Sequence, residues 1–210
     1  MPQPRKLHDE FFTRAKAEGY LARSAYKLLE IQERHRLIRP DDRVLDLGCA
    51  PGSWMQVAAK LVGPRGIVVG VDLTPVTASI GPNVATMIGD AFETSSDALT
   101  APADGPYNVL LSDMAPSTTG HGDDMLSARL CERVLDLAPR VLLPMGNLTM
   151  KILEGEDYMD VLNRTRSMFA IAKGLKPRAS RDVSREMFII GLNFRASACA
   201  PASRATKPGA

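Results

Sequence analysis

Three charged side chains lie where apolar segments of the chain begin or end. Lys151 lies near the end of the apolar run 146–152. Asp113 directly follows the run 107–112, and Glu186 directly precedes a third apolar run. A buried charge is costly unless it is paired or has a role in function. If these runs are neighbouring strands, one edge of the sheet carries an amine beside two carboxylates, a set that suits proton or methyl transfer next to a cofactor.

Short apolar runs alternate with amphipathic stretches, which indicates an α/β fold with a mostly parallel sheet covered by helices on both faces. Periodicity predicts strands at 43–48, 66–72, 84–88, 107–112, 147–152, 170–175 and 187–194, and helices at 9–36 with a break near Gly19, 53–61, 125–142 and 156–169. Ten residues that include Pro177 separate the last two strands, too few for a crossover helix, so these strands should pair antiparallel. We expect residues 1–195 to form one domain and residues 196–210 to form a disordered tail.

Composition argues against several classes of protein. The chain has 210 residues, enough for one core, and no apolar stretch approaches the ~20 residues that cross a bilayer. Cys49, Cys131 and Cys199 form no CxxC pair, so we expect neither a disulfide framework nor a metal site. The polar N-terminus lacks the apolar core of a signal peptide. We therefore expect a cytoplasmic monomer with no membrane partner.

Charge is unevenly distributed although the net charge is only +2. Residues 1–43 hold ten Lys and Arg against seven Asp and Glu, residues 44–163 hold six against fifteen, and residues 164–210 hold ten against two. Basic ends around an acidic middle favour contact with a nucleic acid, although such side chains also simply solvate surface helices.

The turn after the first predicted strand, Asp46–Gly52, indicates the kind of cofactor. Its sequence DLGCAPG lacks the G-x-G-x-x-G spacing that brings a backbone against a pyrophosphate, which argues against a nucleotide-dependent dehydrogenase. An acidic strand residue and a turn with proline suit a cofactor that has a cationic amino-acid end and no phosphate, which indicates S-adenosylmethionine. Asp72 ends the second strand, where a carboxylate accepts from ribose hydroxyls, and Asp90 follows the third, where it could accept from an adenine amine. Trp54 could wall the pocket, although a single tryptophan could equally belong to the core.

Several segments together resemble the FtsJ/RrmJ family of ribosomal RNA 2′-O-methyltransferases over about residues 9–194. They are residues 24–28, 46–54, 70–72, 112–116, Lys151 and 184–186. The resemblance implies a Rossmann-like class I methyltransferase fold that uses S-adenosylmethionine, with seven strands in the order 3-2-1-4-5-7-6. It also implies methylation of a ribose 2′-hydroxyl, on a uridine, in large-subunit ribosomal RNA, with that RNA or the large ribosomal subunit as the partner.

The resemblance also assigns roles to single residues. The family's Lys-Asp-Lys-Glu catalytic tetrad maps onto Lys27, Asp113, Lys151 and Glu186, and its cofactor contacts map onto Gly52, Trp54, Asp72, Asp90 and Asp113. The chain departs from the family at three places: Ser53 replaces a frequent second glycine, Ala91 replaces an aromatic residue, with Phe92 one position later, and the residues after Lys151 are more acidic than in some members. The residue that stacks on adenine is therefore left open.

Three questions stay open at this level. Lys151 could remove the hydroxyl proton as a neutral base, or it could stay charged and stabilise the developing alkoxide, with Asp113 and Glu186 orienting the amine. A different RNA, such as transfer RNA or an mRNA cap, or a non-catalytic role in ribosome assembly, would fit the same sequence less well. Basic side chains near the rim could hold phosphates or merely solvate a loop: Lys173, Lys176, Arg178, Arg181 and Arg185.

Overall fold

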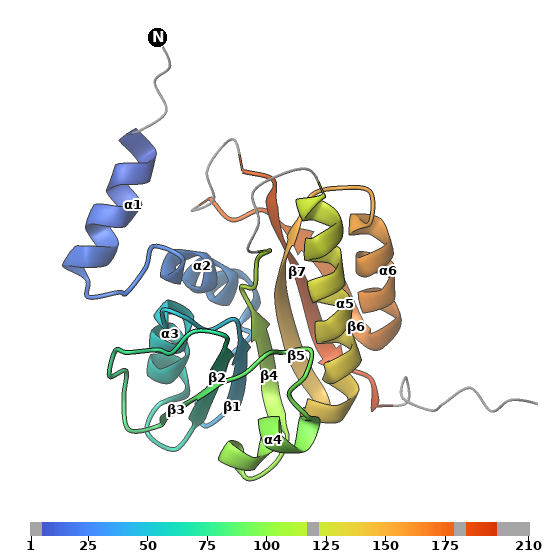
Figure 1. The fold of residues 1–210 in the computed structure, drawn as a ribbon, viewed down its shortest axis with the longest axis horizontal. Coiled ribbons are helices and arrows are strands. Elements are labelled where there is room, and N and C mark those ends of the chain that lie inside the picture. The colour runs from blue at the N-terminus through green and yellow to red at the C-terminus, as the bar shows by residue number, and fades with distance from the viewer. Residues whose placement is uncertain (1–5, 117–121, 179–183, 197–210) are drawn as a thin grey trace, which may run out of the picture.

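The structure is a computed structural model that describes residues 6–116, 122–178 and 184–196. Within them, seven strands form one sheet in the order β3-β2-β1-β4-β5-β7-β6 (Figure 1). β7 runs antiparallel to β5 and β6, and the remaining pairs are parallel. The predicted strand order and the antiparallel last strand are confirmed. The strands are β1 (Arg43–Leu47), β2 (Ile67–Asp72), β3 (Val84–Ile88), β4 (Tyr107–Ser112), β5 (Leu142–Leu153), β6 (Phe169–Leu175) and β7 (Glu186–Phe194).

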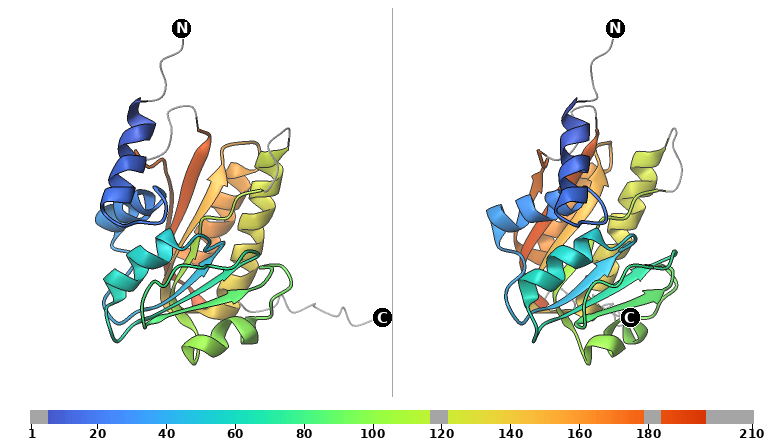
Figure 2. Two further views of the ribbon diagram at one scale, coloured as in Figure 1. Left: turned by 60° about the vertical axis from the view of Figure 1, so that its left-hand side comes forward. Right: turned by 90° about the vertical axis from the view of Figure 1, so that its left-hand side faces the viewer.

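Two helical layers enclose the sheet (Figures 1 and 2). α2 (Ala25–His35) and α3 (Ser53–Val62) cover one face. The short α4 (Ser96–Thr100), the long α5 (Asp123–Val141) and α6 (Tyr158–Met168) pack against the other. Successive strand residues point to opposite faces, so Val44 packs toward α2 and α3 while Leu45 and Leu47 pack toward α5 and α6. β2 and β4 are therefore apolar on both sides, as a doubly covered sheet requires, whereas β5 places Asn147, Thr149 and Lys151 on one face.

The N-terminal helical segment is divided in two, as the glycine suggested. α1 (Lys6–Ala17) ends shortly before Gly19, which has a φ of 75°, and α2 begins at Ala25. In both views of Figure 2, α1 projects from the rest of the domain. An aromatic cluster packs α1 against α2: the centroid of the Tyr26 ring lies 5.5 Å from that of Phe11 on α1 and 5.8 Å from that of Tyr20.

Three elements differ from the sequence prediction, and one of them is a short 3-10 helix, η1 (Ala101–Ala103), that was not predicted. β5 covers 142–153 instead of 147–152, because it begins directly where α5 ends. α4 was not predicted: it is five residues long, too short for apolar periodicity, and its sequence signal is the Ser95 side chain, which accepts a hydrogen bond from the Ala98 backbone N–H at 3.2 Å.

No helix in the described part of the chain combines the length and the apolar character needed to span a bilayer. The same residues contain no group of three or more His, Cys, Asp or Glu side chains placed to bind a metal ion. Arg181 lies outside the described residues, and so does the predicted tail except for Ala196.

Candidate active site

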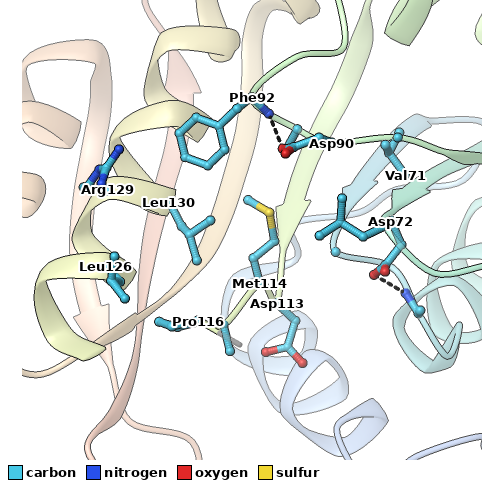
Figure 3. Close-up of a pocket in the computed structure, with 16 residues that line it drawn as sticks. Val71, Asp72, Asp90, Phe92, Asp113, Met114, Pro116, Leu126, Arg129 and Leu130 are labelled. Atoms are coloured by element: carbon cyan, nitrogen blue, oxygen red, sulfur yellow. Dashed lines mark hydrogen bonds between the residues drawn. The ribbon is translucent and has the colours of Figure 1, made fainter. Parts of the chain in front are cut away.

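A cavity of about 490 Å³ lies at the carboxyl ends of the central strands, beside the first turns of α5 (Figure 3). Open α/β sheets bind their ligands at this edge, and the volume is typical of a small-molecule site. Three predicted cofactor contacts line it, namely Asp72, Asp90 and Asp113. The other lining residues are Gly48, Ala50, Val71, Leu73, Gly89, Ala91, Phe92, Met114, Ala115, Pro116, Leu126, Arg129 and Leu130.

Asp72, at the tip of β2, is held by its own loop. One carboxylate oxygen accepts from the Ala50 backbone N–H at 2.9 Å, and the other accepts from the backbone N–H and the hydroxyl of Thr74 at 2.9 and 2.8 Å. No helix begins at Asp72, so its carboxylate does not cap a helix. Because each carboxylate oxygen has two lone pairs and three of the four are used, the fixed side chain keeps acceptor capacity for one hydroxyl of a ribose.

Asp90 lies in the loop after β3 and turns that loop back on itself. Its carboxylate accepts from the Phe92 backbone N–H at 2.8 Å, which Figure 3 shows as a dashed line. From α5, the Arg133 guanidinium donates to the Ala91 carbonyl at 2.8 Å and so anchors the loop from outside the cavity. The ring of Phe92 lines the cavity, and this makes it the available aromatic surface where the sequence left the adenine contact open.

Sequence reasoning missed the wall that α5 contributes. Leu126, Arg129 and Leu130 lie one turn apart on one side of α5 and face the cavity. Leu126 and Leu130 continue the apolar spacing of the helix, so the sequence does not distinguish them from residues that pack on the sheet. Since helix α5 was predicted without its position over the strand ends, those residues could not be assigned to the cavity.

Gly52 and Trp54 do not line this cavity. Gly52 has a φ of 109°, and a Cβ atom there would lie only 2.7 Å from the Ile80 side chain, so the position requires glycine for backbone reasons. Trp54 is 2% exposed and its ring centroid lies 5.7 Å from that of Phe188. Its indole N–H donates to the Ser24 carbonyl at 2.9 Å. The expectation that its ring walls the pocket is therefore corrected, because the ring lies in the core between α2, α3 and the sheet, where its polar atom finds a partner.

Asp46 on β1 is the most unusual carboxylate of the site. It is fully buried, and neither side-chain oxygen has a hydrogen-bond partner. Burial, followed by the negative charges of Asp113 and Asp72, raises the pKa of Asp46 well above its ordinary value. Both neighbours line the cavity, so Asp46 lies close behind it. A buried carboxylate without a partner either takes up a proton or pairs with a cation from outside the chain.

The charges around the cavity therefore suit a cationic ligand. Four carboxylates surround it or lie behind it: Asp46, Asp72, Asp90 and Asp113. Among the described lining residues, the one cation is Arg129, which is exposed at the mouth. A ligand with an ammonium, a sulfonium, a ribose and an adenine would meet the carboxylates of Asp72, Asp90 and Asp113 and the ring of Phe92, with the carboxylate of Asp46 behind them, so the residues fit S-adenosylmethionine.

The four residues of the predicted tetrad come together beside this cavity as two ion pairs. The Lys27 ammonium, from α2, lies 2.8 Å from a carboxylate oxygen of Glu186 at the start of β7. The Lys151 ammonium, from β5, lies 3.1 Å from a carboxylate oxygen of Asp113, and it donates to the Asp113 backbone carbonyl at 2.6 Å. Strand alternation explains the placement: Met150 and Ile152 pack toward α5 and α6, so Lys151 between them points to the face of α2.

The two pairs act on each other electrostatically. Burial alone would raise the pKa of Glu186, but the ammonium of Lys27 and the more distant ammonium of Lys151 outweigh it, so the pKa of Glu186 is lowered. Both lysines are almost completely buried, at 4% and 7% exposure. Asp113 both pairs with Lys151 and lines the cavity, so it connects the amine to the place where a cofactor would lie.

Comparison with known proteins agrees with this geometry. The family model of FtsJ-like methyltransferases matches residues 20–194. The chain is 43% identical over 193 residues to the ribosomal RNA large subunit methyltransferase E of Syntrophobacter fumaroxidans, which covers 91% of this chain and 98% of that relative. The protein of the same name from Acinetobacter baumannii is 41% identical over 192 residues, with 88% and 87% covered.

A solved structure supports the same conclusion. It is a putative ribosomal RNA methyltransferase from Plasmodium falciparum, which superposes with a TM-score of 0.74 at 25% identity and covers 83% of this chain and 98% of its own. A fibrillarin in complex with Nop5p, at 21% identity and a TM-score of 0.60, shares the fold. Because the family model and these relatives match the chain over most of its length, the chain belongs to the FtsJ-like methyltransferase family.

Proposed function

We propose that this methyltransferase transfers the methyl group of S-adenosylmethionine to a ribose 2′-hydroxyl, on a uridine of large-subunit ribosomal RNA. The observation that carries the proposal is that Asp113 belongs to both sites: it pairs with the buried Lys151 and it lines the carboxylate-rich cavity. An amine fixed between the cofactor cavity and the rim is the group that a hydroxyl nucleophile needs. Relatives at 40–43% identity are ribosomal RNA large subunit methyltransferases by name, which favours ribosomal RNA over transfer RNA or an mRNA cap.

The residues of the cavity would hold the cofactor by its charges and its hydroxyls. When bound, S-adenosylmethionine supplies an electrophilic methyl group on a sulfonium. Asp72 would accept from one of the ribose hydroxyls, and Asp90 with Phe92 would contact the adenine. Asp113 and Asp46 would face the cationic amino-acid end, while the backbone around Gly52 and Trp54 would close the turn beside it.

The tetrad would act on the ribose hydroxyl. Two contacts of the Lys151 nitrogen are to Asp113, which leaves a third position on that nitrogen for the sugar oxygen. As a neutral amine, Lys151 would take the hydroxyl proton there on its lone pair; as an ammonium, it would donate its third N–H to the oxygen as negative charge develops on it. Lys27 and Glu186 would fix the geometry from the other side and keep the sum of the four charges at zero.

Exposed basic side chains would bind the RNA backbone. Four such residues are exposed along the segment that leads to Glu186. They are Lys173 on β6, Lys176 just after β6, Arg178, and Arg185 just before β7. Cations there would hold phosphates next to the rim. We propose that the chain acts as a monomer, because all four residues of the tetrad come from one copy.

The direct test is methyl transfer from labelled S-adenosylmethionine to ribosomal RNA from cells that lack the protein. Naked RNA and isolated large subunits would be offered separately, and the product would be digested to nucleosides and identified by mass spectrometry. We expect label in 2′-O-methyluridine from large-subunit RNA. Label in a methylated base, or transfer to transfer RNA alone, would contradict the proposal.

A further inference from the structure

The turn that would hold the cofactor is linked by side chains to the helix that carries Lys27. Ser53 is the first residue of α3 and directly follows the turn 46–52. Its hydroxyl lies 2.7 Å from the hydroxyl of Ser24, the residue before α2. Ser53 is 3% exposed, and the Ser24 hydroxyl is the partner that its side chain has in the structure.

Ser24 also receives hydrogen bonds at its carbonyl from both sides of this junction. The Trp54 indole donates to it at 2.9 Å, and the backbone N–H of Lys27 donates to it at 3.0 Å. The Lys27 ammonium and the Trp54 ring then meet at Phe188, each 5.7 Å from the centroid of that ring. One residue, Ser24, therefore contacts the start of α3 through its hydroxyl and the first turn of α2 through its carbonyl.

We propose that Ser53 is a positioning residue: through the hydroxyl of Ser24 it fixes the first turn of α2, and with it the Lys27 ammonium, relative to the cofactor turn. The proposal rests on the proposed function, since it concerns the placement of a tetrad residue. Ser53 takes the place of a glycine that the resembled family often has, so this contact belongs to chains that carry a hydroxyl here.

A separate contact allows the link to be tested without undocking the segment. Gln56 on α3 accepts from the Leu21 backbone N–H at 2.8 Å and donates to the Gly19 carbonyl at 3.0 Å. These two hydrogen bonds hold the chain before α2 on α3 when the hydroxyl pair is absent. Ser53→Ala and Ser24→Ala are thus expected to fold, and the loss is expected in the position of Lys27.

The first measurement is a double-mutant cycle on methyl transfer with Ser53→Ala, Ser24→Ala and the double variant. Each single variant should lower kcat by about threefold to tenfold, the value of one hydrogen bond, while the Kd for S-adenosylmethionine from calorimetry stays within about twofold. The double variant should be no slower than the slower single one, because both remove the same contact. Ser24→Thr keeps a hydroxyl and should restore kcat.

The matched control is Thr165→Val in α6. Thr165 is fully buried, and its hydroxyl donates to the Val161 carbonyl at 2.8 Å, far from the tetrad. This variant should lower the melting temperature and leave kcat unchanged. If Ser53→Ala behaves like the control, or if the two serine variants add in the double variant, Ser53 is merely structural and the proposal is overturned.

The second measurement does not depend on activity. Lys27 is 4% exposed, and its reaction with an amine-selective acylating reagent, followed by mass spectrometry, reports how well its position is held. Ser53→Ala should raise the labelling rate of Lys27 at least about threefold and leave that of Lys151 unchanged. A wild-type protein that methylates no RNA while this rise is seen would refute the proposed function and leave the link intact. An unchanged labelling rate would overturn the link.

Discussion

Replacing Asp46 with asparagine should stabilise the free protein and weaken its hold on the cofactor. The carboxylate is fully buried, and its two oxygens have no hydrogen-bond partner. Burial first, and the charges of Asp113 and Asp72 second, raise its pKa well above the ordinary value. Such a group either stays ionised without a partner or takes up a proton on folding, and both lower stability at neutral pH.

Proton uptake sets an upper limit on this loss. An unfolded aspartate has a pKa of ~3.9, and each pH unit above it corresponds to about 1.4 kcal/mol, so a carboxyl that stays protonated costs up to about 4 kcal/mol at pH 7 and up to about 1.5 kcal/mol at pH 5. Because the folded pKa is the higher one, stability is intact below the unfolded pKa and is lost as the pH rises toward the folded pKa. At about 2–4 °C per kcal/mol for a chain of this size, Asp46→Asn should raise the melting temperature by up to about 8–16 °C at pH 7 and by less at pH 5.

The assay is scanning calorimetry of the free protein at pH 5, 6 and 7, with S-adenosylmethionine titrations at pH 7. Affinity should fall about tenfold to a hundredfold in Asp46→Asn, because a charge-assisted contact to a cationic group is lost. Asp72→Asn is the control, since its carboxylate accepts three hydrogen bonds and an amide there should lower the melting temperature. A lower melting temperature for Asp46→Asn, or a gain that grows as the pH falls, would refute the reasoning.

Three further predictions follow from contacts in the same region. Trp54→Phe removes the indole hydrogen bond and keeps the ring packing, so urea unfolding should show a loss of about 1–2 kcal/mol while cofactor affinity stays within about threefold. Glu186→Gln leaves the Lys27 ammonium without its counter-charge. Because the pKa of Glu186 is lowered in the folded protein, the loss of stability should be full above pH ~4.5 and should shrink as the pH falls through the lowered pKa. Acid titration followed by circular dichroism would detect this. Arg185→Ala should reduce the slope of log K for RNA against log salt by roughly 0.7–0.9, whereas Arg65→Ala, before β2 at the opposite edge of the sheet, should not.

The strands and the three charged residues at their ends could be predicted because they depend on strong local signals, whereas the strand order and the place of Lys27 in the tetrad followed from the family resemblance. Buried strands in an α/β sheet are continuous apolar runs, and a charged residue such as Lys151 at the tip of one is visible in the sequence. The short connection between β6 and β7 fixed the direction of β7, and so put Glu186 at the same edge as Asp113 and Lys151.

The placement of Trp54 could not be predicted, because which way the start of α3 faces depends on where α2 docks. The wall formed by Leu126, Arg129 and Leu130 depends likewise on the position of α5 over the strand ends. The pairing of Lys27 with Glu186 and of Lys151 with Asp113, and not the reverse, is a matter of side-chain geometry at a rim where four charges meet. Residue type carries no information on that choice.

The most direct test of the account is single-turnover methyl transfer by Lys151→Met, with S-adenosylmethionine affinity measured on the same preparation. Methionine keeps the apolar stem of the side chain and removes the amine beside Asp113. We expect affinity within about threefold of the wild type and transfer to RNA at least about a hundredfold slower, the usual contribution of a positioned acid–base group. Transfer at the wild-type rate would contradict the assignment of Lys151 to the reaction and, with it, the role of the whole tetrad.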